Sequence, residues 1–400
     1  MTDAVLTINA GSSSIKFALF ERDDPVRPQA ALRGELDGIG AQPRLKARDA
    51  QGAVLAELTF AELAGLPADE QHRRSLDFLV RWLDEHDNAW RIIAVGHRVV
   101  HGADRYAAPV ALSPADVDAL AGFVPLAPLH QPHNLAGIEA AAARFPGIPQ
   151  VACFDTAFHR THAWEADTYA LPPAYYARGV RRYGFHGLSY EYITQTLAAE
   201  DPLLVQGRLV VAHLGNGASL CAIAGGRSVD STMGFTALDG VPMGTRSGQI
   251  DPGVLLYLLD QEGMSTSNLT RLLYGNSGLR GMSGLSQDVR VLEASDRPEA
   301  AQALAYFAFR VRREIGALAA VLGGIDALVF TAGIGENARA LRARICEGLE
   351  FLGIRIDPAR NQANGPELSP DGSAVRVLMR RTDEEGMIAQ HVLALLAGAG

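Results

Sequence analysis

Two arginines in the sequence have surroundings that suit the binding of an anion. Arg98 lies in HRVVHG (residues 97–102), at the end of an apolar run, where a buried charge without a partner would be costly. Arg246 lies in MGTRSG (residues 243–248), where the glycines predict a loop and favour a functional role. A guanidinium can hold a carboxylate or a phosphoryl group through two parallel hydrogen bonds. For Arg98 the sequence leaves a structural salt bridge and an anion-binding role equally open.

Three glycine-rich segments follow apolar runs and could form backbone nests for phosphate, because glycine lets a ligand approach the N–H groups closely. They are VLTINAGSSSIKFAL (5–19), VVAHLGNGASLCAI (210–223) and VFTAGIGEN (329–337). None contains the G-x-x-x-x-G-K-S/T pattern of a P-loop, and Gly333-x-Gly335 lacks the third glycine of a dinucleotide fingerprint. One such segment alone is more often an ordinary turn. Three together favour a nucleotide held across a cleft.

The elements that must position these groups alternate between short apolar strands and amphipathic helices, which predicts an α/β fold. Strands are expected at residues 5–8, 15–20, 92–100, 209–212, 220–224 and 327–331. Helices are expected after Ser113-Pro114, from Asp251-Pro252 to about Gly263, and over residues 300–322, up to Gly323 and Gly324. The strand, turn and strand of the first glycine-rich segment recur in the second, 204 residues later. This spacing predicts two lobes of similar architecture.

Histidines and acidic residues give weaker signals. His130, His186 and His213 stand near Gly or Pro in expected loops. The best candidate for a metal pair is His159-x-x-His162, but no second ligand pair lies at a suitable spacing, which disfavours a metal site there. Asp155 follows an apolar run and Glu384 lies in an acidic segment. For both of them a helix cap or a solvated face is the ordinary alternative to a functional role.

The composition limits the classes of protein that remain. The chain has 400 residues, 48% of them hydrophobic, enough for two or three domains with cores of their own. A formal net charge of −9 argues against a general basic surface for nucleic acid or anionic lipid. Only two of the 36 basic residues are lysines, and Lys16 lies just beyond the first glycine-rich turn, where a flexible point charge can follow a phosphate. The three cysteines are dispersed and the N-terminus does not resemble a leader, which predicts a cytoplasmic protein. The sequence has no apolar run of about 18 residues, so no membrane span is expected.

Eight motifs occur in order along nearly the whole chain: NAGSSSIKF (9–17), HRVVHG (97–102), LAPLH (126–130), YGFHG (183–187), HLGNGAS (213–219), MGTRSG (243–248), FTAGIGEN (330–337) and TxEE (382–385). Together they resemble the acetate kinase family, within the superfamily of sugar kinases, actin and Hsp70-type proteins. The resemblance implies an α/β fold of two similar lobes, each a mixed sheet with helices, and an active-site cleft between them. Residues 1–155 with about 383–400 would form the lobe with the acyl substrate and the first phosphate hairpin. Residues of about 156–382 would form the lobe for nucleotide binding and dimerisation.

The resemblance also implies an activity, the reversible transfer of the ATP γ-phosphoryl group to acetate, giving acetyl phosphate and ADP. A small carboxylic acid with a pKa of about 4.3, like that of a Glu side chain, is already an anion at pH 7, so it attacks without a general base. The catalytic residues that carry over are Arg98, Arg246, His186 and Asp155. Asp155 is often described as an acid or base in this family. Because the substrate needs no deprotonation, we expect Asp155 to position an arginine or a metal-bound water instead.

Binding residues carry over by their places in the same motifs. The acyl substrate would contact Arg98, Val100, Leu129, His130, Phe185 and Ala237. Mg²⁺, or Mn²⁺, would bind at Asn9 and Glu384, directly or through water. The ATP phosphates would face Lys16, His213, Leu214, Gly215, Asn216 and Gly217. The adenosine side of ATP would contact Asp288, Val289, Arg290, Gly333, Ile334, Gly335, Glu336 and Asn337, and a homodimer is implied by the resemblance alone.

Three positions depart from the family pattern. Ala237 stands where Pro is usual, Gln249 where Asp is usual and Tyr190 where His is common. The smaller Ala237 predicts a wider acyl pocket that tolerates propionate better, since one methylene is worth about 1–3 kcal/mol in such a site. One alternative is therefore a propionate or butyrate kinase of the same fold. An alternative from another class is a non-catalytic ATP-binding module, which the presence of both arginines disfavours.

Overall fold

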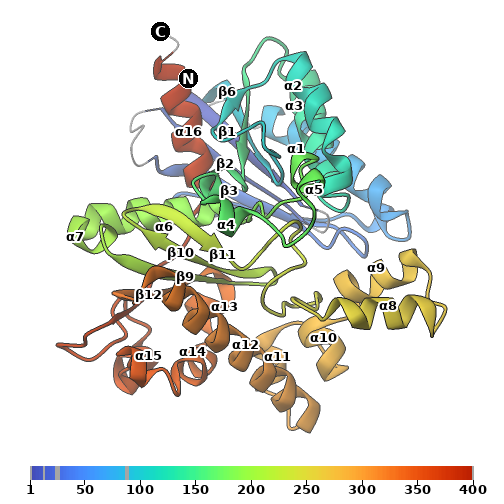
Figure 1. Cartoon of the computed structure of the whole chain (residues 1–400). Helices are drawn as coiled ribbons and strands as arrows, with labels where there is room; N and C mark the ends of the chain where they lie inside the picture. The colour runs from blue at the N-terminus through green and yellow to red at the C-terminus, as the bar shows by residue number, and fades with distance from the viewer. Residues whose placement is uncertain (1, 12–13, 23–27, 86–89, 399–400) are drawn as a thin grey trace. The chain divides into compact units, whose positions relative to one another are not determined.

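The chain divides into two compact units in the computed structural model, which describes residues 2–11, 14–22, 28–85 and 90–398 (Figure 1). Unit 1 consists of Met1–Phe158 and Asp383–Gly400, and unit 2 of His159–Thr382. Ser12 and Ser13 of the first glycine-rich turn lie outside the described residues. The end of the chain therefore returns to the unit that contains its beginning.

Unit 1 is built on an eight-stranded mixed sheet. Its strands are β1 (Thr2–Ala10), β2 (Ile15–Glu21), β3 (Ala30–Asp37), β4 (Arg44–Asp49), β5 (Val54–Thr59), β6 (Trp90–Val99), β7 (Val110–Ala111) and β8 (Gln150–Phe154). They lie in the order β5-β4-β3-β2-β1-β6-β8-β7. β1 pairs antiparallel with β2 and parallel with β6, and β6 pairs parallel with β8. The carboxyl ends of β1, β6 and β8 therefore meet at one edge of the sheet.

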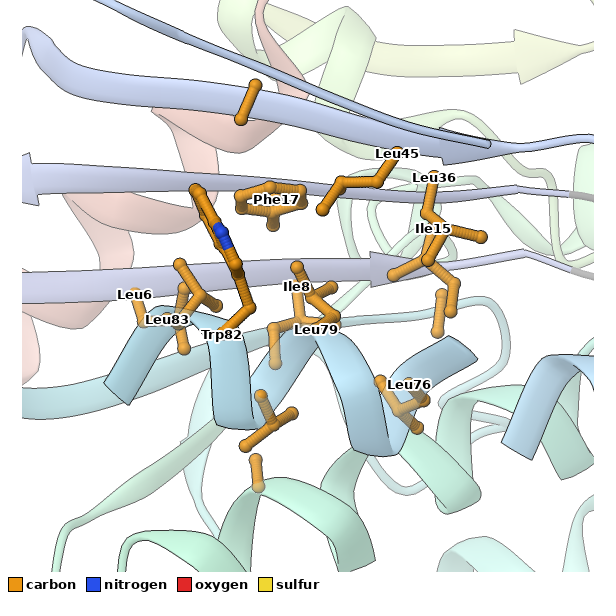
Figure 2. Close-up of a cluster of buried hydrophobic side chains, with 14 of the residues drawn as sticks. Leu6, Ile8, Ile15, Phe17, Leu36, Leu45, Leu76, Leu79, Trp82 and Leu83 are labelled. Atoms are coloured by element: carbon orange, nitrogen blue, oxygen red, sulfur yellow. The ribbon is translucent and has the colours of Figure 1, made fainter. Parts of the chain in front are cut away.

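Helices cover both faces of this sheet: α1 (Ala68–Glu85), α2 (Pro114–Gly122) and α3 (Gln131–Arg144) belong to one layer and α16 (Glu384–Gly398) to the other. Successive residues of a strand point to opposite faces. Ile8 and Phe17 accordingly lie in the core cluster that packs against α1 and includes Leu79 (Figure 2), and burial of each contributes about 1.5–3 kcal/mol. Ala18 and Phe20 point the other way, against α16. Packing of α16 on this face fixes where its first residue, Glu384, lies.

Unit 2 repeats the central part of this design. Its strands are β9 (Arg208–Leu214), β10 (Ala218–Ala224), β11 (Arg227–Ser231), β12 (Ala327–Thr331) and β13 (Arg376–Met379). They lie in the order β11-β10-β9-β12-β13, with β9–β10 and β10–β11 antiparallel and β9–β12 and β12–β13 parallel. The order and directions match those of β3-β2-β1-β6-β8 in unit 1. The predicted fold class, two α/β lobes with similar mixed sheets, is confirmed.

The helices of unit 2 are α4 (Trp164–Asp167), α5 (Pro173–Ala177), α6 (Gly187–Glu200), α7 (Pro202–Val205), α8 (Pro252–Asp260), α9 (Thr266–Gly275), α10 (Gly278–Ser283), α11 (Val289–Glu293), α12 (Pro298–Leu322), α13 (Ala332–Asn337), α14 (Arg339–Cys346) and α15 (Pro358–Ala363). The long helix α12 packs on β9, β10 and β11. It ends where Gly323 takes a left-handed conformation with φ of 68°, as the sequence predicts. None of the helices described in either unit is long and apolar enough to cross a membrane.

All six strands expected from the sequence are present, and the Ser113 cap of α2 forms a full capping box with Asp116. Two expectations need correction. α8 ends at Asp260 rather than near Gly263, and Gly333 and Gly335 lie inside α13 rather than in a turn before it. The reason for the second difference is Ala332, whose positive φ of 62° turns the chain from β12 directly into the helix.

Candidate active site

Arg98 and Asp155 form a buried ion pair at the carboxyl ends of β6 and β8. Arg98 Nη2 lies 2.6 Å from Asp155 Oδ2, and Arg98 Nε lies 3.0 Å from Oδ1, so the guanidinium donates hydrogen bonds to both carboxylate oxygens. The side chain of Asp155 is 1% exposed and that of Arg98 is 17% exposed. Burial raises the pKa of Asp155, and the Arg98 guanidinium opposes that shift. Asp155 thus acts as a structural partner of Arg98, as the expected positioning role requires.

Asn9 and α16 complete the surroundings of Arg98. Asn9 Oδ1 accepts a hydrogen bond from Arg98 Nη1 at 3.1 Å, and Asn9 Nδ2 lies 3.4 Å from Glu384 Oε2. Glu384 Oε2 is also 3.9 Å from Arg98 Nε. The packing of α16 on the sheet brings Glu384, far away in sequence, to the ends of β1 and β6. Asn9 and Glu384, the two residues expected at the metal, are therefore neighbours.

These two side chains fit a magnesium ion that keeps most of its water. Both offer hard oxygen donors, and Mg²⁺ is commonly held by one or two carboxylates together with substrate phosphates. No group of three or more His, Cys, Asp or Glu in the described ranges is arranged to hold a metal ion. The oxygen of Asn9 is already engaged by Arg98. If Mg²⁺ binds here, Glu384 would be the direct ligand and Asn9 would act through water.

Lys16 lies directly opposite Asn9 in the β1–β2 pair, so the two side chains share one face of the sheet. Burial and the neighbouring Glu384 raise the pKa of Glu385, and the Lys16 ammonium partly opposes that shift. The lysine side chain is exposed. Lys16 therefore belongs to the same cluster of unit 1 as Asn9 and Glu384, beside the first hairpin turn.

In unit 2 the second glycine turn, between β9 and β10, lies beside two stacked histidines. The rings of His186 and His213 are 4.1 Å apart and nearly parallel, at 17°. His186 precedes α6 in a left-handed conformation with φ of 58°. A Cβ added to Gly217 would come within 3.3 Å of His186 Nε2 and 3.9 Å of Arg246 Nη1. The backbone of this turn, the two imidazoles and Arg246 thus form one cluster.

Arg246 is positioned by a loop that other backbone groups hold. The N–H of Gly244 donates to the Asn216 carbonyl at 3.0 Å, which ties the arginine loop to the glycine turn. Gly278, with φ of 60°, packs so closely on the loop that an added Cβ would lie 2.2 Å from the Met243 oxygen. Arg246 Nη1 donates to the carbonyl of Ala237 at 2.8 Å. Arg246 lies in a loop, as the sequence predicts, and its side chain is hydrogen-bonded to the backbone of Ala237.

A cavity of about 690 Å³ lies in unit 2 where three distant segments meet. This volume suits a nucleotide-sized ligand. Eight of the residues expected at ATP line it: Gly215, Asn216, Asp288, Val289, Arg290, Gly333, Ile334 and Asn337. Gln287, Glu293 and Ala338 also line the cavity and were missed, although each lies within three residues of an expected one.

Other residues expected at ATP lie around this cavity but do not line it. Leu214 is fully buried in β9, and Gly335 is buried against the Phe330 and Ala212 backbone. Glu336 Oε1 accepts a hydrogen bond from the Thr382 N–H at 3.2 Å. Arg342, also missed, is completely buried and donates to the carbonyls of Gly335 and Glu336 at 2.8 Å. Through these two bonds Arg342 holds the end of α13 in place.

The residues expected at the acyl group are divided between the two units. Arg98, Val100, Leu129 and His130 belong to unit 1, and Phe185 and Ala237 to unit 2. Val100 and Phe185 are buried, whereas the Leu129 side chain is exposed and His130 precedes α3. Each unit taken by itself therefore contains only part of the expected acyl pocket.

His159 and His162, the pair that the sequence disfavours as a metal site, both contact Ser228. His159 Nδ1 and His162 Nε2 both lie 2.8 Å from Ser228 Oγ, and His159 Nε2 lies 2.9 Å from the Phe185 carbonyl. Burial lowers the pKa of His159 to about 4 and that of His162 to about 3. The two rings support the segment that leads into His186.

The family model described as the acetokinase family matches residues 4–390. The chain belongs to the acetokinase family. An acetate kinase of Methylocella silvestris is 52% identical over 403 residues, which cover 99% of this chain and 98% of that protein. The solved structure of Porphyromonas gingivalis acetate kinase is 36% identical, covers 98% of this chain and 100% of its own, and superposes with a TM-score of 0.86. The solved structure of a propionate kinase from Francisella tularensis is 34% identical. It covers 97% of this chain and 98% of its own, and superposes with a TM-score of 0.88.

The family predicted from the eight ordered motifs is thus confirmed, and so is the fold. The similarity extends over nearly the whole chain, including both units. The chemical roles of individual residues remain predictions, to which the geometry above gives a physical basis.

Proposed function

We propose that the protein catalyses reversible transfer of the γ-phosphoryl group of ATP to acetate, giving acetyl phosphate and ADP. The observation that carries this assignment is 52% identity over 99% of the chain to an acetate kinase, within a family that matches residues 4–390. The enzyme is a phosphotransferase with a carboxyl group as acceptor, and ATP and ADP are its co-substrates.

The pairing of Asp155 supports direct attack by the carboxylate. Acetate is ionised at pH 7 and has no proton to lose before it attacks phosphorus. Asp155 accepts hydrogen bonds from Arg98 through both oxygens, so its role is to hold that guanidinium in place. Arg98 would then orient the carboxylate or acyl phosphate, with Val100, Leu129 and His130 of the same unit beside it.

Charge on the transferred phosphoryl group requires donors that are in place before the reaction. Arg246 and His186 would supply them in unit 2, next to the backbone N–H groups of the glycine turn. Phe185 and Ala237 would contact the acyl chain. The cavity lined by Asp288, Val289 and Arg290 would hold the adenosine part of ATP.

Mg²⁺, or Mn²⁺, would be held at Glu384 and, through water, at Asn9. When bound, this ion neutralises charge on the ATP phosphates. Lys16, on the same face as Asn9, would add a mobile positive charge there. Isothermal titration of Glu384→Gln with Mg²⁺ and ADP should show weaker metal-dependent nucleotide binding, whereas unchanged binding would remove Glu384 from the metal site.

A propionate kinase activity is the second candidate. Ala237 is the observation in its favour, and a solved relative is a propionate kinase with a TM-score of 0.88. Trapping acyl phosphates as hydroxamates with acetate, propionate and butyrate separates the two functions. The highest kcat/KM with acetate is expected; a higher value with propionate would replace the main assignment.

The arginine mechanism is tested by Arg246→Ala with Arg271→Ala as the matched control. Arg271 is an exposed arginine of the same unit that bonds Asn268. Loss of one preorganised donor should lower kcat about 10²- to 10³-fold while ATP binding persists. Equal activities of the two variants would refute the role of Arg246.

A homodimer and a cytoplasmic location complete the proposal. In α8 no residue is buried, and Leu256 and Tyr257 are 60% and 55% exposed, which supports a subunit contact on this helix. Sedimentation should show a dimer that Leu256→Glu weakens. All three cysteines are buried thiols rather than disulfides, which supports a reducing compartment.

A further inference from the structure

His186 is held by two hydroxyl groups within unit 2. Ser219 Oγ lies 2.8 Å from His186 Nδ1, and the hydroxyl of Tyr190 lies 2.5 Å from the same Oγ. Tyr190 is completely buried, and burial raises the pKa of its hydroxyl well above the usual value, so the group keeps its proton. Within the described ranges Ser219 is the acceptor that this proton has, and a buried O–H without an acceptor is costly. Tyr190 therefore donates to Ser219, which can in turn donate its own proton to His186 Nδ1.

His213 is held in the same manner by a different pair of hydroxyl groups. Thr382 Oγ1 donates to Ser189 Oγ at 2.8 Å, and Ser189 Oγ lies 2.8 Å from His213 Nδ1. Ser189 Oγ, which accepts from Thr382, can donate its own proton to His213 Nδ1. In this arrangement each of the two stacked imidazoles accepts a hydrogen bond at Nδ1.

An imidazole that accepts at Nδ1 carries its proton on Nε2. The two Nε2 atoms lie beside the turn between β9 and β10. A Cβ added to Gly217 would be 3.3 Å from His186 Nε2, and one added to Gly215 would be 4.0 Å from His213 Nε2. With the protons on Nε2, both N–H donors would lie beside the backbone turn that is expected to face phosphate.

We propose that Tyr190 and Ser219 are positioning residues that fix His186 as the Nε2–H tautomer, so that it presents a donor to the transferred phosphoryl group. Thr382 and Ser189 do the same for His213. The inference rests on the proposed function, because it describes how that site holds its donors. Without the Tyr190 hydroxyl, His186 can place its proton on Nδ1 and give it to Ser219. The lone pair on Nε2 would then face, and repel, an anionic oxygen.

The first test is the tautomer of His186 in the wild-type full chain. In protein labelled with ¹⁵N-histidine, two-bond ¹H–¹⁵N correlations show which ring nitrogen carries the proton, and His186→Gln identifies the signal. The proton is expected on Nε2, and a proton on Nδ1 in the wild type would overturn the proposal. This measurement does not depend on activity, so its failure is distinct from failure of the proposed function, which wild-type turnover of ATP and acetate tests.

The second test compares Tyr190→Phe with Tyr183→Phe. The control tyrosine is also buried and also loses one hydrogen bond, from its hydroxyl to the Gly179 carbonyl at 2.7 Å. Tyr190→Phe should lower kcat about tenfold, as expected for one poorly oriented hydrogen bond in the transition state, with KM values within about twofold. Tyr183→Phe should keep kcat within about twofold. Equal kcat in the two variants would contradict the proposal.

A double-variant cycle separates positioning from packing. If Tyr190 acts only through Ser219, then Tyr190→Phe/Ser219→Ala should be no slower than Ser219→Ala alone. If Tyr190 merely fills the core, the two effects on kcat multiply, and the positioning role is refuted. In Tyr190→Phe the His186 signal should also show protonation of Nδ1; a signal unchanged from the wild type would be evidence against the proposal.

Discussion

Removal of the Arg98 side chain should be more harmful to unit 1 than removal of its partner. In Arg98→Ala the carboxylate of Asp155, 1% exposed, loses all of its hydrogen bonds from side chains of the described chain. Breaking a buried ion pair in this way lowers the free energy of unfolding by about 3–5 kcal/mol. In Asp155→Ala the guanidinium of Arg98 keeps its hydrogen bond to Asn9 at 3.1 Å and some access to water. The free energy of unfolding is therefore expected to fall by only about 1–3 kcal/mol.

The cost of Arg98→Ala should depend on pH in a definite direction. Without the guanidinium, burial and the nearby Glu384 charge raise the pKa of Asp155 further above the value of about 3.9 in the unfolded chain. The folded state then binds the extra proton, so stability is lost as pH rises. The pKa is already raised in the wild type, where Arg98 opposes the shift, so the additional loss of stability in Arg98→Ala between pH 5 and pH 7 should be at most about 2.7 kcal/mol.

Urea unfolding at pH 5 and pH 7 measures both effects. Trp82 and Trp90 belong to unit 1, and Trp164 of unit 2 is 64% exposed, so the change in tryptophan fluorescence on unfolding should come mainly from the part of the chain that contains the pair. The double variant Arg98→Ala/Asp155→Asn is the control, because it removes the titrating carboxyl and with it the added pH dependence. A cost below about 1 kcal/mol at pH 7, or equal costs at the two pH values, would refute the reasoning.

Three further outcomes are expected. Ala237→Pro should lower the propionate-to-acetate ratio of kcat/KM by a factor of about 5–10, because the larger proline would remove part of the contact that the pocket makes with the extra methylene of propionate. An unchanged ratio would show that Ala237 does not widen the pocket. Lys16→Arg should reduce kcat/KM for ATP about three- to tenfold, because a planar guanidinium cannot follow a phosphate as a compact ammonium does; an unchanged value would exclude this role. Burial lowers the pKa of His97 to about 4, so the unfolded chain binds the extra proton and stability should fall by up to about 1.4 kcal/mol per pH unit between pH 6.5 and 4. In urea titrations His97→Gln should lack this part of the slope, and an unchanged slope would contradict it.

Local features of the fold could be read from the sequence because they depend on neighbouring residues. The hairpin around Gly215 follows from small residues between two apolar strands, and the start of α2 follows from the cap at Ser113. The polar strands β3, β4 and β5 were missed. Residues 44–49 (RLKARD) bury only alternate side chains, and their pairing is stabilised by neighbouring strands rather than by a continuous apolar run.

The sequence by itself determined which residues were candidates for chemistry, because the motifs preserve residue types and their local order. It could not show that Arg98 pairs with Asp155, 57 positions away, or that α16 brings Glu384 to Asn9. Those contacts depend on the parallel pairing of β6 with β8 and on the packing of α16 against Ala18 and Phe20. Only the tertiary structure fixes such distances, since strand register and helix packing result from burial summed over the whole unit and not from any local pattern.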